Sequence, residues 1–302
     1  MTRHAFVAVA LALALLVAGC VGTTGESTTV STTTDATAAT DAGAGTATPT
    51  GSNTVATTGS GATSDGDAGS GFEDVDADAL ATAAASSLAT AEGAVVEGNL
   101  TRTVRTASGT TTVDVTFTER DDVADRELAI ERTVRGNGQR VETATYLVNG
   151  TFYERSPAYE RQYGTEWVRL PADGAWSNAS STAVVARLAN ASSAAVTGET
   201  SVDGDAAVVL DLDVNESALA TLSGYRVDAD ALNALSGTVT VDADTGRVHA
   251  ATVHVNRTVE NAYGQEVTVV TDVTRKFTAY EPVTVSLPDA ASEATPINGT
   301  QG

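Results

Sequence analysis

The sequence predicts an α+β protein built from two antiparallel β-meanders and a few helices. Val113, Val115 and Phe117 alternate with polar residues, and this period of two is typical of strands that bury one face. Short turn signals separate the alternating segments, so neighbouring strands should run antiparallel. Apolar residues at helical spacing precede the first meander and recur between the two meanders, which predicts the helices.

The chain begins with a predicted export signal. A basic start leads into an apolar run from Ala5 to Val17. This run has about thirteen residues, whereas a membrane-spanning helix needs about 20, so residues 1–19 are predicted to be a signal peptide. The segment Val17-Ala18-Gly19-Cys20 resembles the lipobox of bacterial and archaeal lipoproteins. The resemblance implies a lipid on Cys20 and a lipid-anchored location on the cell membrane, facing the exterior; an ordinary signal peptide with an incidental cysteine is the alternative.

Residues 20–71 are predicted to be a disordered, lipid-anchored linker. From Thr23 to Gly71 the chain is nearly half Ser and Thr and shows no apolar period, so burial cannot offset the entropy of ordering it. We expect residues 72–288 to form a single domain of sheet plus helices, and residues 289–302 to form a polar, flexible tail.

Acidic residues dominate the charge of the chain. Its 302 residues hold 39 Asp and Glu against 17 Lys and Arg, which gives a net charge of −22, and Lys276 is the single lysine. This excess of negative charge argues against nucleic acid as a partner. The composition resembles that of haloarchaeal proteins, whose acidic surfaces stay hydrated in concentrated salt. At 1 M salt the screening length is about 3 Å, so the self-repulsion becomes tolerable.

The predicted domain opens with a helix and a long meander. Acidic residues over 73–78 suit a helix N-terminus, and Leu80, Ala84 and Leu88 recur at four-residue spacing. Residues 94–148 then alternate as consecutive long strands. The turn signals between them are Ser108-Gly109, Asp121-Asp122 and Gly136-Asn137-Gly138.

Half of the aromatic residues lie in one stretch, from Tyr146 to Trp176. Asn149-Gly150 predicts a hairpin there, and Pro157 and Pro171 bracket a segment that we expect to be irregular. Amphipathic rings gathered in this way suit the rim of an apolar pocket or a partner contact. A hydrophobic plug at the end of the sheet is the alternative. The candidate ligand-binding residues are Tyr153, Tyr159, Tyr163, Trp167 and Trp176.

Helices and a second meander follow this stretch. Apolar spacing predicts a helix over residues 178–190, with Ser177 or Asn178 as its N-cap. Two short helices, which start at Asn215 and Asp228, are expected to cross the sheet. The expected strands cover residues 206–214, 238–241, 248–260 and 266–277, with an edge strand over 282–287. On the first of these strands, the side facing the core should carry Val208, Leu210, Leu212 and Val214.

No constellation in the chain indicates catalysis, so we expect neither an enzyme nor a cofactor or metal site. His249 and His254 are five residues apart on one predicted strand, so their side chains should point to opposite faces and cannot share a metal. Motifs of nucleophilic hydrolases and of phosphate-binding loops are missing from the sequence; carboxylate pairs stay open as an alternative. The candidate glycosylation sites, each in an Asn-x-Ser/Thr sequon, are Asn99, Asn149, Asn178, Asn190, Asn215, Asn256 and Asn298.

The order of the predicted elements resembles the LolA and LppX/LprG group of lipoprotein carriers over residues 72–287. In that group a curved antiparallel sheet, an incompletely closed half-barrel, is covered by helices and encloses an apolar cavity for acyl chains. The resemblance implies a membrane-anchored binding or carrier lipoprotein for an apolar, lipid-like ligand. The alternative is a non-catalytic structural or interaction module of the archaeal cell envelope that holds no small ligand.

Replacing Cys20 by serine should leave the precursor unprocessed or release the domain from the membrane, because no other stretch is apolar over enough residues to anchor it. Membrane fractionation and the mass of the mature chain measure these outcomes. Full membrane retention of correctly cleaved Cys20→Ser protein would contradict the lipobox interpretation.

Overall fold

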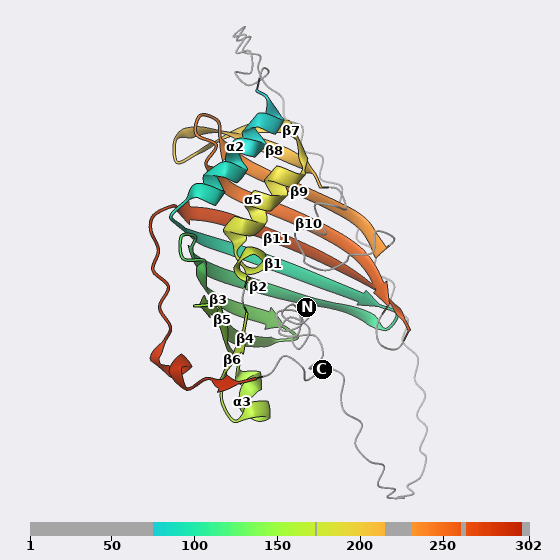
Figure 1. Cartoon of the computed structure of the whole chain (residues 1–302). Helices are drawn as coiled ribbons and strands as arrows, with labels where there is room; N and C mark the ends of the chain where they lie inside the picture. Colours follow the sequence, from blue (N-terminus) through green and yellow to red (C-terminus); the bar gives the residue numbers. More distant parts are fainter. Residues whose placement is uncertain (1–74, 173, 215–230, 261–263, 298–302) are drawn as a thin grey trace, which may run out of the picture.

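A single twelve-stranded sheet organises the protein. The computed structural model describes residues 75–172, 174–214, 231–260 and 264–297. Figure 1 shows the sheet as an open, curved layer with helices across one side. The predicted α+β class and the curved, incompletely closed antiparallel sheet are therefore confirmed.

The first meander contains six strands. They are β1 (Gly93–Thr106), β2 (Gly109–Asp122), β3 (Glu127–Gly136), β4 (Gln139–Val148), β5 (Thr151–Arg155) and β6 (Trp167–Pro171). Two of its hairpins turn at Asn137-Gly138 and Asn149-Gly150, where all four residues have positive φ, as a type I′ turn requires. The turn predicted at Asp121-Asp122 is displaced, because these residues end β2 and pair with Leu128 and Glu127.

The second meander contains β7 (Ser193–Val202), β8 (Asp205–Asp213), β9 (Leu232–Asp242), β10 (Val248–Glu260) and β11 (Glu266–Ala279). Four predicted strands correspond to β8, β9, β10 and β11, although β9 begins before the predicted residues 238–241. Strand β7, which is rich in small and polar residues, was not predicted. The helix expected from Asp228 is wrong over Leu232 and Leu235, because both leucines belong to β9 and pair with β10. The helix expected from Asn215 lies outside the described residues.

Strands β1 and β11 join the two meanders into one sheet. They pair antiparallel over most of their length, for example at Leu100 with Val273. The resulting order is β12-β6-β5-β4-β3-β2-β1-β11-β10-β9-β8-β7, in which the short β12 (Thr295–Pro296) is parallel to β6. The longest strands of both meanders therefore lie at the centre of the sheet.

Helices cover only part of the sheet. They are α2 (Ala77–Thr90), α3 (Pro157–Tyr163), α4 (Trp176–Ala179) and α5 (Ser181–Ala191). We call the face on which α2, α4 and α5 lie the inner face and the opposite one the outer face (Figure 1). Within the described ranges no helix has the length and apolar character to cross a membrane.

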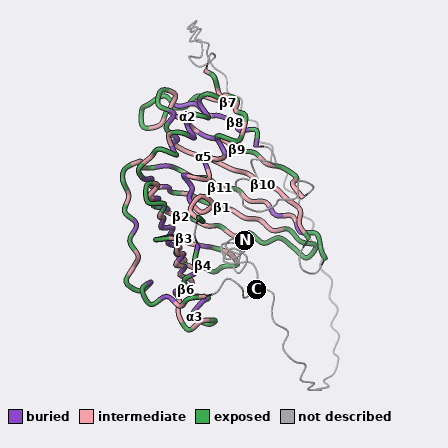
Figure 2. The backbone as a smooth tube through the Cα atoms, viewed as in Figure 1, coloured by how far each residue is buried: buried purple, intermediate pink, exposed green. Residues whose placement is uncertain are grey.

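The main core lies between α2, α5 and the inner face. Leu80 and Leu88 of α2 and Leu188 of α5 are buried against the strands of the second meander. Full burial of one such leucine contributes about 1.5–3 kcal/mol. The predicted core side of β8 is confirmed, since Val208, Leu210, Leu212 and Val214 are all buried. In Figure 2, buried residues lie beneath the two helices and again along the strands of the first meander.

Two predictions about the middle of the chain are corrected. The helix expected over 178–190 is divided into α4 and α5, because Ser180 has extended backbone angles and caps α5 by accepting from Ala183 N. The segment expected to be irregular between Pro157 and Pro171 contains α3 and β6. Pro157 is the first residue of α3, a position where its missing N–H costs nothing.

The C-terminal segment covers the outer face of the first meander. Val285, Ala291 and Ala294 pack there against Tyr146 and Trp167. Residues 282–287 form no strand, in contrast to the predicted edge strand. The segment predicted as a flexible tail contains the 3₁₀-helix Asp289–Glu293, with Ala291 fully buried, and β12. This part of the sheet is therefore covered on both faces.

Candidate ligand-binding site

A cavity of about 480 Å³ lies on the inner face of the sheet. Strands β1, β2, β3 and β11 line it, and Ala179 and Ser181 border it from α4 and α5. Its apolar lining includes Leu100, Val113, Val115, Phe117, Ile130 and Val273. Ligand pockets in proteins typically measure about 300–1,000 Å³ and combine apolar walls with a few polar groups, so this cavity has the character of a ligand site.

The cavity exists because the helices end before the apolar face does. Along β1, Val96 is fully buried beneath the helices, whereas Leu100 and Val104 on the same face are half-buried. Val113 and Val115, which lie beside them on β2, are also half-buried. Figure 2 shows this change from buried to intermediate residues along the central strands. The sequence thus supplies an apolar strip that the described helices do not cover.

A glycine shapes the floor of the cavity. Gly98 pairs with Phe117 across β1 and β2. A Cβ atom at Gly98 would lie 2.2 Å from Cζ of Phe117, so a larger residue would displace the ring. Glycine in a strand often marks such a close approach. The absence of a side chain at Gly98 therefore leaves room for the Phe117 ring against β1.

Basic residues outnumber acidic ones in the lining of the cavity, in contrast to the chain as a whole. Three arginines and one glutamate line it, namely Arg102, Arg132, Arg275 and Glu119. Over the whole chain, acidic residues outnumber basic ones by 39 to 17. The lining of this cavity thus carries more basic than acidic residues within a strongly anionic protein.

Glu119 attaches the N-terminus of α5 to the sheet. Its two carboxylate oxygens accept from Ser181 N at 2.6 Å and from Ser181 Oγ at 2.7 Å. Arg275 donates from Nε to the same Ser181 Oγ at 3.0 Å. A helix N-terminus presents free N–H groups and favours a nearby carboxylate, so this contact fixes where α5 begins.

Asp121 makes a second attachment two residues further along β2. It accepts from Trp176 Nε1 at 2.8 Å and from the Ser180 hydroxyl. Trp176 opens α4 and Ser180 is the N-cap of α5. Glu119 and Asp121 together therefore hold the corner between the two helices at one end of the cavity.

Burial perturbs both carboxyl groups. Loss of solvent, followed by repulsion from Asp121, raises the pKa of Glu119 to about 7. Burial also raises the pKa of Asp121, although its hydrogen bonds oppose the change. The corner therefore takes up a proton near neutral pH.

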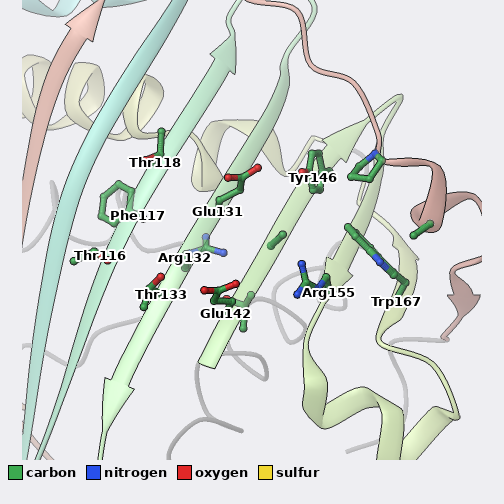
Figure 3. Close-up of a pocket in the computed structure, with 14 residues that line it drawn as sticks. Thr116, Phe117, Thr118, Glu131, Arg132, Thr133, Glu142, Tyr146, Arg155 and Trp167 are labelled. Carbon is green, nitrogen blue, oxygen red and sulfur yellow. The ribbon is translucent and has the colours of Figure 1, made fainter. Parts of the chain in front are cut away.

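A second hollow, of about 720 Å³, lies on the outer face of the same strands (Figure 3). Its lining is mainly polar and includes Thr116, Glu131, Glu142 and Arg155. Trp167 closes one side, with its ring centroid 5.9 Å from that of Tyr146. This hollow is larger but suits an apolar ligand less well than the inner cavity, because its polar groups would lose water without replacement.

The five predicted aromatic residues do not gather around one opening. Tyr153 and Trp167 are on the outer face, where Trp167 is only 8% exposed, as the plug alternative requires. Tyr159 is buried in α3 and donates to Glu154, and its ring contacts Tyr163. Trp176 binds Asp121. None of the five lines the inner cavity, so their role as ligand contacts stays a prediction.

The inner-site residues were missed at the sequence level, although a signal for them existed. Phe117, Glu119 and Asp121 continue the period of two that places Val113 and Val115 on the covered face. Two carboxylates on a face predicted to be buried require partners. That requirement pointed to the polar corner, but not to which helix would supply its donors.

Other predicted sites have varied surroundings. Cys20, Asn215 and Asn298 lie outside the described residues. Asn99, Asn149 and Asn190 are exposed, whereas Asn178 and Asn256 are half-buried. His254 binds Asp272 on the outer face at 2.6 Å. In the part of the chain that the structure describes, no group of three or more His, Cys, Asp or Glu is placed to hold a metal ion.

No protein-family model matches the chain, and its sequence matches no curated protein. Solved structures of similar shape include LprF from Mycobacterium bovis, with 12% identity over 71% of this chain and 96% of that one and a TM-score of 0.40. The Mycobacterium tuberculosis lipoprotein LppX has 14% identity over 69% and 97%, with a TM-score of 0.41. An outer membrane lipoprotein-sorting protein domain from Vibrio parahaemolyticus has 10% identity over 70% and 94%, with a TM-score of 0.25. These values are too low to carry an argument about function.

The raised pKa of Glu119 predicts a stability that falls as pH increases. The folded state holds a proton on this group up to about pH 7, whereas an unfolded glutamate releases it near pH 4.3. The free energy of unfolding should therefore decrease across this window, by about 4 kcal/mol for this group. Glu119→Gln, which mimics the protonated form, should remove that part of the decrease in urea titrations at about pH 5 and about pH 8.

Glu97→Gln is the matched control, because Glu97 is an exposed residue of the adjacent strand β1. It should retain the full pH dependence of the wild type. Equal pH dependence in the Glu119→Gln and Glu97→Gln variants would contradict the proposed protonation of the corner.

Proposed function

We propose that this protein is a membrane-anchored, extracytoplasmic lipoprotein that binds or carries an apolar, lipid-like ligand in its inner cavity. The observation that carries the proposal is the uncovered apolar strip on β1 and β2 that ends beneath α4 and α5. A lipid on Cys20 would hold the protein at the membrane, where such ligands are found. The folded domain would then act as a binding module without catalysis.

The energetics favour an alkyl chain as the ligand. Each methylene moved from water into an apolar site contributes about 0.8 kcal/mol. Water occupies roughly 30 Å³ per molecule, and a methylene group is of similar size, so the cavity of about 480 Å³ holds about sixteen such groups. A single long acyl chain therefore matches the space, and its burial would offset the cost of immobilising it.

Uptake of diphenylhexatriene, a neutral rod-shaped probe that fluoresces in apolar surroundings, tests the proposal. The wild type should bind it with saturation. Val115→Trp, which projects a large ring into the cavity, should reduce uptake by at least about tenfold, equal to about 1.4 kcal/mol. Fluorescence titration measures the change, and thermal melting verifies that the variant is folded.

Thr116→Trp is the control for this experiment. Thr116 is the next residue of β2 and lines the outer hollow, so its replacement leaves the inner cavity open and should preserve uptake. Loss of uptake in Thr116→Trp alone would indicate that the ligand binds in the outer hollow. Absence of uptake in the wild type would contradict the carrier proposal and favour the envelope module.

A further inference from the structure

Arg102 lies in the apolar part of the cavity. It occupies β1 between the half-buried residues Leu100 and Val104 on the inner face. Its strand neighbours are Val113 on β2 and Thr271 on β11. The Nε atom of Arg102 is shielded from solvent and has no hydrogen-bond partner among the residues that the structure describes. A buried donor on a charged group normally has a partner, because leaving it unpaired costs about 1–3 kcal/mol or more.

The charge of Arg102 is also uncompensated by its described surroundings. Burial and the neighbouring cation Arg257 both lower the pKa of Arg102. By contrast, Arg132 has Glu119 and Glu154 nearby, and Arg275 has Glu119. Arg132 and Arg275 thus have carboxyl groups beside them, whereas the charged group that acts on Arg102 among the described residues is another arginine.

We infer that the ligand is a single-chain anionic amphiphile whose head group binds Arg102, while its chain lies over Leu100, Val115 and Phe117 towards Ile130. The inference rests on the proposed function and adds the charge and orientation of the ligand. An anionic oxygen can accept from Nε and complete the planar fork of donors that a guanidinium presents. Arg257 supplies additional positive potential without lining the cavity.

This arrangement also explains why the site is selective in an acidic protein. A net charge of −22 repels anions from the outer surface. The cationic Arg102 inside the apolar cavity attracts an anion there, and the low dielectric of the cavity strengthens this attraction. Neutral chains of equal length gain the burial energy alone, and cationic chains are repelled by Arg102.

Competition against bound diphenylhexatriene tests the inference with four sixteen-carbon ligands: hexadecanoate, hexadecyl phosphate, hexadecanol and hexadecylamine. The two anions should bind about 10- to 100-fold more tightly than the alcohol, as expected for a charged hydrogen bond worth about 1.5–3 kcal/mol. The amine should bind more weakly than the alcohol. A preference for one anion over the other distinguishes a carboxylate from a phosphate head group, and either supports the inference.

Arg102→Gln should bring the affinity for both anions down to that of the same variant for hexadecanol, and Arg102→Lys should retain part of the preference. Arg135→Gln removes an exposed arginine of β3 and should have no effect. Equal affinity of the wild type for anions and alcohol would overturn the inference while leaving the proposed function intact. An equal loss in Arg135→Gln would also overturn it, because the preference would then reflect overall charge. Failure of every ligand to bind would instead refute the proposed function.

Discussion

The attachment of α5 to two buried carboxylates of β2 is the interaction on which the site depends. Glu119 accepts hydrogen bonds from the N–H and the hydroxyl of Ser181. Asp121 accepts hydrogen bonds from Trp176 Nε1 and the Ser180 hydroxyl. These contacts place the helix N-terminus at one fixed position on the sheet. The inner face is buried on one side of that position and left partly uncovered on the other, so the same contacts determine where the cavity begins.

The cavity consequently has two chemically different ends. At the corner, Arg275 and Glu119 share Ser181 and compensate each other. Away from the corner, Arg102 lies between the apolar residues Leu100 and Val104 of β1, with another arginine as its charged neighbour. A ligand with an apolar chain and an anionic head group can match both parts of the cavity in only one orientation. Because the pKa of Glu119 is raised, the hydrogen bonds between Glu119 and the N-terminus of α5 also depend on pH.

The sequence predicted much of the sheet and little of the site. Alternation over 94–148 and 248–277 predicted the long strands, because one-sided burial leaves a strong period of two. The small, polar residues of β7 carry no such signal. Leu232 and Leu235 fit a helical spacing, although both belong to β9 and pair with β10. The aromatic stretch gave no indication of the inner cavity, because Trp167 lies on the outer face. Arg102 reaches the cavity through the pairing of β1 with β11, and these two strands are far apart in the sequence.

Photocrosslinking with a diazirine-bearing fatty acid tests most directly whether the inner face holds the ligand. After irradiation, mass spectrometry of peptides locates the adducts. The account predicts labelling of inner-face residues of β1 to β3, such as Phe117 and Ile130, and loss of labelling when unmodified fatty acid competes. Competed adducts confined to the outer face around Tyr146 and Trp167 would contradict it, as would labelling that excess fatty acid does not reduce.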